Sequence, residues 1–389
     1  MAFFRNTAVN RINIHYGIQA LATGAGGVFV VVYLLRAGVP LPGALLTMAG
    51  ILAGRFLIRP IILPIAKRWG LKTTLVIGTL LIAVQFPVLA QVHGVGWGLA
   101  ALILSASLGD TFYWSSYHAY FAALGDEEHR GHQIGAREAI AAVIGIAAPL
   151  LGAWGLVTFG PSVTFWAVGV AQALGVIPLI GLPNIPVAAE APGSFRAARL
   201  GMLMFAADGW FVAGYYFVWQ VALFVAVHEN FAAYGGAMAL AALIGAIGGL
   251  LLGRRIDMGH GLRMSFIAYG VAASVVLLRA ASVGSPWLAV AANAPGALVA
   301  ALQSTAMMAP VYNMAKASPC PLRFHIATEG GWDIGCFSGC VLAAAIAASG
   351  HSLSYAMLLA LLGSGASIAL LSVYYARLGA GDQTLAPAA

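Results

Sequence analysis

The chain has 389 residues, of which 61% are hydrophobic and only 8% are charged, and its net charge is +7. Soluble domains carry about a quarter charged residues, so this composition excludes a water-soluble fold and indicates a membrane protein. The positive charge does not indicate a nucleic-acid partner, because the basic residues form no stripe and no patch interleaved with aromatic residues. Three cysteines, Cys320, Cys336 and Cys340, give neither a disulfide framework nor a C-x-x-C metal pattern.

Apolar segments long enough to cross a bilayer recur along the whole chain. A membrane helix needs about 20 mainly apolar residues, and the first such stretch follows the N-terminus without a small-residue cleavage site, so we expect a span and not a signal peptide. In chain order, the predicted spans lie at 12–36, 40–65, 73–92, 96–123, 135–158, 162–183, 199–227, 231–253, 264–282, 286–313, 324–349 and 352–376. We therefore predict an all-α polytopic membrane protein with twelve transmembrane helices.

The basic residues predict the orientation of these spans. Most of the 19 Lys and Arg residues fall on the side of the N-terminus, and only Arg36 and Arg279 fall at the opposite ends of spans. Basic residues concentrate in cytoplasmic loops, so both termini are predicted to be cytoplasmic. The high alanine and glycine content suggests a bacterial source and hence the inner membrane.

A polar, proline-containing stretch after the sixth span divides the chain. Its prolines, Pro183, Pro186 and Pro192, cannot continue a helix. We predict an N-terminal six-helix bundle at 1–183, a cytoplasmic linker at 184–198 and a C-terminal six-helix bundle at 199–389.

The two halves repeat short features at one fixed offset. Gly70-Leu71-Lys72 corresponds to Gly261-Leu262-Arg263, and Glu138 corresponds to Glu329 near the start of the fifth span of each half. Duplicated six-helix halves are an architecture of secondary transporters.

The loop between the second and third spans carries a family resemblance. The chain resembles the major facilitator superfamily, whose loop there reads G-x-x-x-D-R-x-G-R-[RK]. Arg68, Gly70 and Lys72 match this pattern, while Lys67 replaces the aspartate. The corresponding loop of the second half keeps the aspartate as Asp257 but lacks the following arginine.

A second pattern of the family lies in the fifth span. Exporting members carry G-x-x-x-G-P-x-x-G-G, and this chain keeps Gly145, Pro149 and Gly152 while two glycines have become alanine. The arginine that the family uses in span four for proton coupling is absent. The resemblance therefore covers nearly the whole chain and tilts the expected direction toward export.

What the resemblance implies is a secondary active transporter that works by alternating access. Arg68, Gly70, Lys72, Asp257 and Glu138 would belong to its cytoplasmic gating loops. No nucleotide-binding loop and no catalytic motif is present in the sequence, so neither a pump nor an enzyme is expected, and no cofactor. The alternatives are an importer or uniporter, or a non-transporting assembly or sensing protein on the same fold.

Charges at membrane depth cost roughly 2.5 kcal/mol or more, which makes each one a candidate site. In span four, Asp110, Trp114 and His118 follow one another at helical spacing. Asp110 is expected to take up a proton or to bind a cationic group; the alternative is an ion pair with Arg55 or Arg59.

Three further carboxyl groups lie in the second half. Asp208 is the corresponding candidate in span seven, and Glu329 and Asp333 share a face of span eleven. Two adjacent carboxylates repel, so we expect at least one to hold a proton, as a coupling site requires. The alternative is that this pair ties span eleven to a neighbour, through Arg323 or His325.

The remaining polar candidates are basic or amide side chains. Arg55 and Arg59 are expected either to contact an anionic solute or to pair with carboxylates, and Asn293 and Gln303 either to contact the solute or to pack helices. His15 is expected to anchor span one at the interface. The predicted partners are a small-molecule or amphiphilic substrate, protons and membrane lipid; we expect a monomer and no metal.

Overall fold

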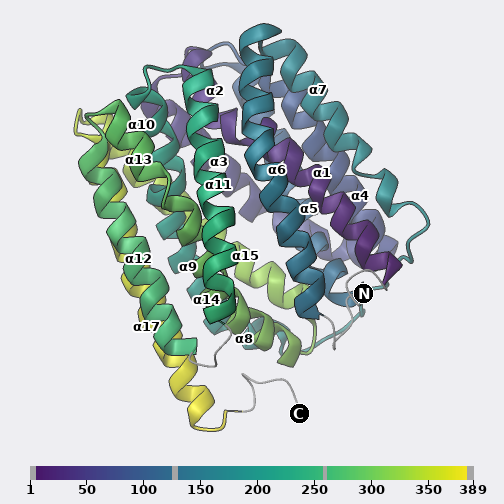
Figure 1. Cartoon of the computed structure of the whole chain (residues 1–389). Coiled ribbons are helices and arrows are strands. Elements are labelled where there is room, and N and C mark those ends of the chain that lie inside the picture. The colour runs from purple at the N-terminus through teal and green to yellow at the C-terminus, as the bar shows by residue number, and fades with distance from the viewer. Residues whose placement is uncertain (1–5, 125–129, 257–260, 383–389) are drawn as a thin grey trace. The chain divides into compact units, whose positions relative to one another are not determined.

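The structure is a computed structural model of the chain, and it describes residues 6–124, 130–256 and 261–382 (Figure 1). Within these ranges every regular element is helical. This confirms the predicted all-α class.

In its described part, the first half of the chain contains seven α-helices before its proline-containing segment. They are α1 (Thr7–Ala25), α2 (Val30–Arg36), α3 (Leu41–Ile58), α4 (Ile62–Leu89), α5 (Trp97–Leu124), α6 (Arg130–Thr158) and α7 (Gly160–Leu174). An irregular segment leads from α7 to the short helix α8 (Ser194–Ala197). It contains the prolines that the sequence marks as helix-breaking.

The second half continues in the same way. Its helices are α9 (Arg199–Val212), α10 (Trp219–Ala226), α11 (Phe231–Ile256), α12 (Gly261–Ser282), α13 (Pro286–Asn293), α14 (Gly296–Ala317), α15 (Pro321–Ala348), α16 (Leu353–Leu358) and α17 (Ala360–Gly379). Each predicted span contains at least part of one of these helices, although the predicted sixth span, 162–183, extends beyond the end of α7 at Leu174.

Within the described residues, eight helical stretches are long and apolar enough to cross a membrane. One of them, Leu41–Leu89, is 49 residues long, which is far more than the roughly 20 residues that one crossing needs. Gly70 interrupts it with φ 76° and ψ 168°, a backbone conformation that glycine adopts without steric cost. The total of twelve crossings stays a prediction.

Several spans contain interruptions that hydropathy does not reveal. Span seven runs from α9 into α10 through a π-helical segment, Ala213–Val218. Span ten breaks between α13 and α14, where Pro295 precedes the first residue of α14. Such irregular backbone in a membrane helix is tolerated where protein buries it, and π-turns are frequent at functional sites.

By its contacts, the chain forms two compact units. Unit 1 comprises Met1–Val39, Leu57–Ala189 and Phe231–Ala239, and unit 2 comprises Pro40–Phe56, Glu190–Asn230 and Leu240–Ala389. Most of α3 thus belongs to unit 2, although α3 precedes the predicted linker by more than a hundred residues. The predicted division at 184–198 is a statement about topology, and it stays a prediction.

Unit 1 is held together by close backbone contacts at small residues. A Cβ atom on Gly78 of α4 would lie 2.4 Å from the backbone nitrogen of Tyr113 on α5. A Cβ atom on Gly152 of α6 would lie 2.1 Å from the carbonyl oxygen of Ala25 on α1. The Gly145–Gly152 stretch is therefore in part a packing face, as small residues provide in membrane helices.

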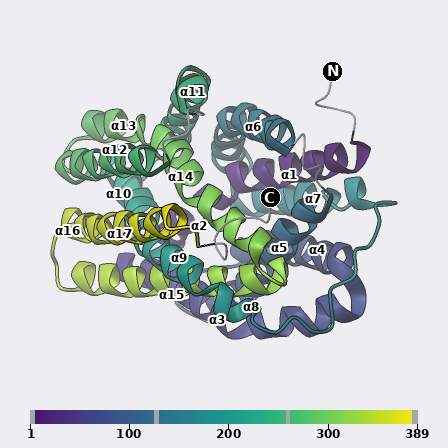
Figure 2. The ribbon, with the colours of Figure 1, turned by 90° about the horizontal axis from the view of Figure 1, so that it is seen from below.

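Unit 2 has its closest packing between α9 and α15, which lie side by side in Figure 2. A Cβ atom on Gly209 would lie 2.3 Å from the carbonyl oxygen of Trp332, and one on Gly335 would lie 1.9 Å from that of Ala206. Because both contacts are to backbone, α9 and α15 can approach this closely only with glycine at these positions.

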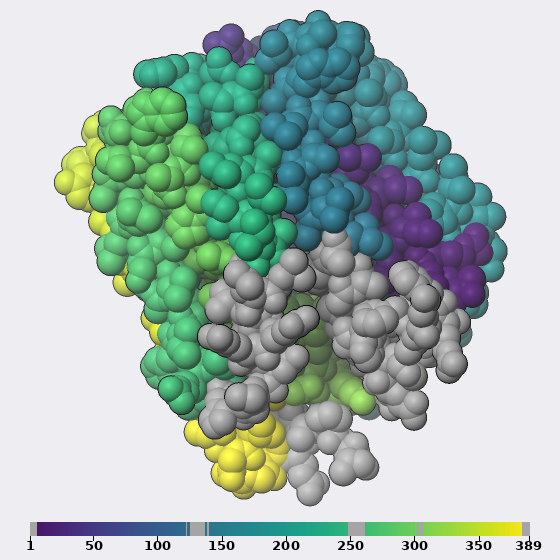
Figure 3. All heavy atoms as spheres, viewed as in Figure 1, coloured from purple at the N-terminus to yellow at the C-terminus, as the bar shows by residue number. Residues whose placement is uncertain are grey.

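The exposed face of α12 is apolar. On α12, which is green in Figure 3, the side chains of Phe266, Ile267, Leu277 and Leu278 are exposed. Large exposed apolar residues along a helix of this length are expected for a surface that faces lipid.

Candidate functional site

A buried ion-pair network lies inside unit 2. The Nε of Arg55 on α3 lies 2.9 Å from Oδ1 of Asp333, and its Nη2 lies 3.3 Å from Oε2 of Glu329. Both carboxylates are on α15, one helical turn apart. The Asp333 side chain has no solvent exposure, and those of Arg55 and Glu329 are 8% and 11% exposed.

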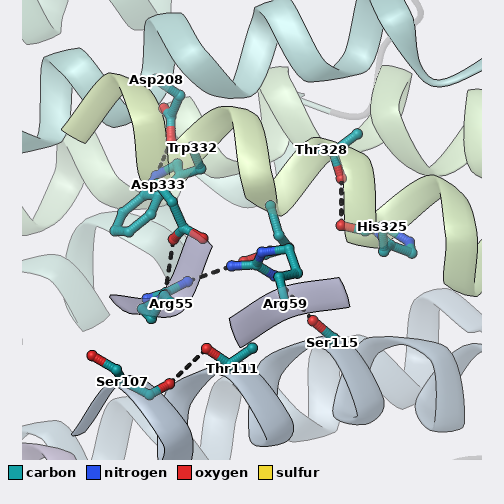
Figure 4. A network of polar contacts seen from close by, with 11 residues as sticks. Arg55, Arg59, Ser107, Thr111, Ser115, Asp208, His325, Thr328, Trp332 and Asp333 are labelled. Carbon is teal, nitrogen blue, oxygen red and sulfur yellow. Dashed lines mark hydrogen bonds and ion pairs between the residues drawn. The ribbon is translucent and has the colours of Figure 1, made fainter. Parts of the chain in front are cut away.

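Asp208 on α9 joins the same network (Figure 4). Its Oδ2 accepts a hydrogen bond of 3.2 Å from Nε1 of Trp332, and its Oδ1 accepts one of 3.2 Å from Nε2 of Gln303 on α14. The Trp332 ring in turn lies under the Arg55 guanidinium, 5.2 Å from centroid to Cζ. Trp332 thus connects the carboxyl group of Asp208 to the cation.

The local fold explains why these groups meet. On α15, positions 329, 332 and 333 fall on neighbouring parts of the helix surface because an α-helix repeats every 3.6 residues. On α9, Gly209 follows Asp208 and lets this helix approach the backbone of α15. Arg55 reaches α15 because the segment Pro40–Phe56, which contains most of α3, packs within unit 2.

The network holds three carboxyl groups and one guanidinium. Breaking a buried ion pair by removing one partner typically costs 3–5 kcal/mol, because the other charge is left uncompensated. The positive charge of Arg55 offsets the repulsion between Glu329 and Asp333. Arg55 is therefore shared between two carboxylates, and the loss of either negative charge would leave the other carboxylate as its ionic partner.

The sequence predicted five of these residues as candidates, namely Arg55, Asp208, Gln303, Glu329 and Asp333, and the structure brings all five together. It pairs Glu329 and Asp333 with Arg55, a partner that the sequence offered for Asp110. Trp332 was missed. Its only signal is its place beside Asp333, which is weak because tryptophan in a membrane helix more often marks the interface.

The span-four candidates lie in unit 1. Asp110, Trp114 and His118 are all on α5, and the rings of Trp114 and His118 stack at 5.8 Å between centroids. Asp110 is partly buried. Arg59 is buried in the same unit, and its Nη1 donates a hydrogen bond of 3.1 Å to Oγ of Ser115 on α5.

His15 is not an interfacial anchor. Its side chain has no solvent exposure, and Nδ1 lies 2.7 Å from the carbonyl oxygen of Gly175. Because a carbonyl only accepts, Nδ1 carries a proton and donates it. The ring stacks on Tyr113 with 5.6 Å between centroids, so His15 belongs to the aromatic interior of unit 1.

The loop between the second and third spans is tied to the end of the sixth. Asn184 Oδ1 accepts from the backbone N–H of Lys72 at 3.1 Å, and the Lys72 ammonium donates to the carbonyl of Leu182 at 2.7 Å. Gly70 leaves the space that Asn184 occupies, and Arg68 is exposed. Asp257 and the side chain of Glu138 lie outside the described residues.

Asn293 takes part in a separate polar contact in unit 2. Its Oδ1 accepts a hydrogen bond of 2.9 Å from Nε1 of Trp219, where α13 meets α10. Within the described part of the chain, no group of three or more His, Cys, Asp and Glu side chains could hold a metal ion.

A sequence profile identifies the family of this chain. The profile of the Major Facilitator Superfamily matches residues 14–322. The chain belongs to the major facilitator superfamily. It is accordingly a transporter-type, multi-pass membrane protein, and the resemblance read from Arg68, Gly70 and Lys72 is confirmed.

Solved structures of transporters share the fold. A crystal structure of an auto-inhibited POT family peptide transporter is 14% identical and has a TM-score of 0.66, with 97% of each chain covered. A crystal structure of a proton-dependent oligopeptide (POT) family transporter is 12% identical and has a TM-score of 0.70, with 93% of this chain and 100% of that one covered. No curated protein matches the chain.

Proposed function

We propose that the protein is a secondary active transporter that couples movement of a small or amphiphilic solute to protons. The observation that carries this proposal is the pairing of one buried guanidinium, Arg55, with two carboxylates, Glu329 and Asp333. A buried charge inside a membrane protein is a functional candidate by default, and carboxylates in this setting serve as proton relays.

The coupling step follows from the charge balance of the network. A proton that binds Asp333 neutralises it, and the energetically favourable partner of Arg55 is then Glu329 alone. Loss of the proton restores the shared pairing. The two pairings differ in the force between α3 and α15, so protonation biases one conformation over another, as an allosteric switch requires.

The cycle we propose is alternating access in the inner membrane, with the halves 1–183 and 199–389 rocking about a central solute site. Asp208, Gln303 and Trp332 are the proposed solute contacts in the second half, and Asp110 and His118 those in the first. Export is the proposed direction, and it rests on the sequence pattern around Pro149.

The test is proton movement in sealed proteoliposomes that contain a pH-sensitive dye. The solute panel contains amines, carboxylates, short peptides and amphiphiles, because likeness at 12–14% identity supports the fold alone. We expect one class of solute to move protons in the wild type but not in Asp208→Asn, while Arg36→Gln stays active, since Arg36 is exposed.

Three results would count against parts of the proposal. Solute flux without proton movement would indicate a uniporter. Uptake that follows an imposed inward proton gradient would indicate import. Folded protein that moves no solute of any class would favour an assembly or sensing role on the same fold.

A further inference from the structure

A second buried arginine in unit 2 has no acidic partner among the described residues. Arg279 on α12 is 5% exposed, and its Nη1 donates a hydrogen bond of 2.8 Å to the backbone carbonyl of Tyr215. No aspartate or glutamate in the described part of the chain forms an ion pair with it. Its Nε is buried and has no hydrogen-bond partner.

Aromatic rings enclose this guanidinium. Its Cζ lies 4.3 Å from the ring centroid of Tyr215 and 4.7 Å from that of Trp219. Both residues belong to span seven, and Tyr215 lies in the π-helical segment. Gly296 provides the room on span ten, because a Cβ atom there would lie 1.9 Å from Nη2.

These neutral contacts do not compensate the charge. A cation–π contact contributes about 2 kcal/mol when it is desolvated, whereas removing one ion from water costs several kcal/mol even after the protein relaxes. The positive charge of Arg55, in contrast, is compensated by two carboxylates. The Arg279 site therefore has a planar donor group, a free N–H and an uncompensated positive charge, which together match an oxyanion.

We infer that Arg279 is an anion-binding residue whose guanidinium takes a carboxylate or a similar oxyanion between spans seven and ten. The Tyr215 and Trp219 rings fix the plane of the guanidinium and exclude water. An organic carboxylate that enters from the aqueous phase and the phosphate of a lipid headgroup share this chemistry. The burial of Arg279 among helices favours the soluble carboxylate.

The test is thermal unfolding of the purified protein in neutral detergent, with chloride replaced by acetate or benzoate at constant ionic strength. A ligand that binds only the folded state raises the Tm in a saturable way. We expect this rise in the wild type and in the exposed-arginine control Arg36→Gln, and no rise in Arg279→Gln. A parallel arm adds phosphatidylglycerol without carboxylate, and a rise in that arm alone would identify the lipid phosphate as the source.

Arg279→Lys keeps the charge but loses the planar fork, so we expect saturation to need at least a tenfold higher benzoate concentration. This variant also serves if Arg279→Gln does not fold. The inference does not depend on coupled transport, because Asp208→Asn is expected to lose proton movement and to keep the benzoate response. It is overturned if neither arm raises the Tm of the wild type, or if Arg279→Gln responds as the wild type does.

Discussion

Arg55 and Asp333 form an ion pair of 2.9 Å between α3 and α15, although 278 positions separate them in the numbering and Asp333 is completely buried. The same arginine is shared with Glu329 at 3.3 Å. One guanidinium thus connects α3 to the helix that carries both carboxylates, and the consequences can be measured separately for stability and for transport.

Replacing Arg55 by glutamine is expected to destabilise the protein by about 3–5 kcal/mol, because it leaves two buried carboxylates without a counter-charge. The measurement is thermal or denaturant unfolding of the purified protein. Arg36→Gln removes the same charge from an exposed position and is expected to cost less than Arg55→Gln does. Equal losses in the two variants would contradict the assignment of Arg55.

The two carboxylates are expected to differ in their coupling to Arg55. Asp333 is fully buried and makes the shorter contact with Arg55. The interaction energy measured in the Arg55→Gln/Asp333→Asn cycle should therefore exceed that measured in the Arg55→Gln/Glu329→Gln cycle. Both energies are expected to fall within about 0.5–3 kcal/mol. Double-mutant cycles on unfolding free energies provide the measurement. The reverse order would mean that Glu329 is the principal partner.

Asp208→Asn is expected to cost about 1–3 kcal/mol and to abolish proton-coupled flux. The amide has one oxygen, so its NH2 group must face an N–H of either Gln303 or Trp332. For the stability measurement, Trp332→Phe is the matched control, because it removes one hydrogen bond, at about 1 kcal/mol, and keeps a ring beside Arg55. Retention of coupled flux in Asp208→Asn would exclude the Asp208 carboxylate as a required solute contact.

Gly335→Ala is expected to destabilise unit 2 by about 1–3 kcal/mol, because the new methyl group would overlap the carbonyl oxygen of Ala206 and push α9 from α15. Gly365→Ala on α17 places the same methyl group in open space and is expected to be neutral or stabilising. Tm values of the two variants make the comparison. Similar Tm values would show that α9 and α15 do not require this approach.

Asn184→Ala is expected to cost about 0.5–2 kcal/mol, as the loss of a helix cap does, because the helix that resumes after Gly70 loses an acceptor for the N–H of Lys72. Asn184→Asp keeps this acceptor and should retain much of the stability. The bond of Asn184 Nδ2 to the carbonyl of Trp69, 2.6 Å long, is lost in both variants. Equal losses of stability in both variants would show that the hydrogen bonds donated by Asn184 Nδ2 stabilise this turn and that the acceptor for the Lys72 N–H does not.

The sequence predicts the helices well because apolar length alone determines where a chain can cross lipid. It also marks the buried charges, since Arg55, Asp208, Glu329 and Asp333 are conspicuous in apolar surroundings. It cannot pair them, because pairing depends on which helix faces which. From the sequence alone, Asp110 and Asp333 are equally acceptable ion-pair partners for Arg55.

Other features were beyond the sequence for different reasons. His15 lies near the end of its span, where position alone favours an interfacial role, and only packing shows it to be enclosed. The π-helical segment of span seven has no residue pattern that distinguishes it from α-helix. The position of Arg279 in the sequence predicts that it lies at the outer end of a span. Its burial depends on the absence of a side chain at Gly296 on span ten.

The spacing of residues on two helices has an electrical consequence for unit 2. Asp208 and Tyr215 lie about two turns apart on span seven, and Gln303 and Gly296 lie about two turns apart on α14, a separation of roughly 10 Å. The acidic network is at one level and the unpaired guanidinium at the other, so the interior carries a dipole along span seven. A solute with separated charges that binds there would be oriented by its ends, and its length would decide whether both ends are held.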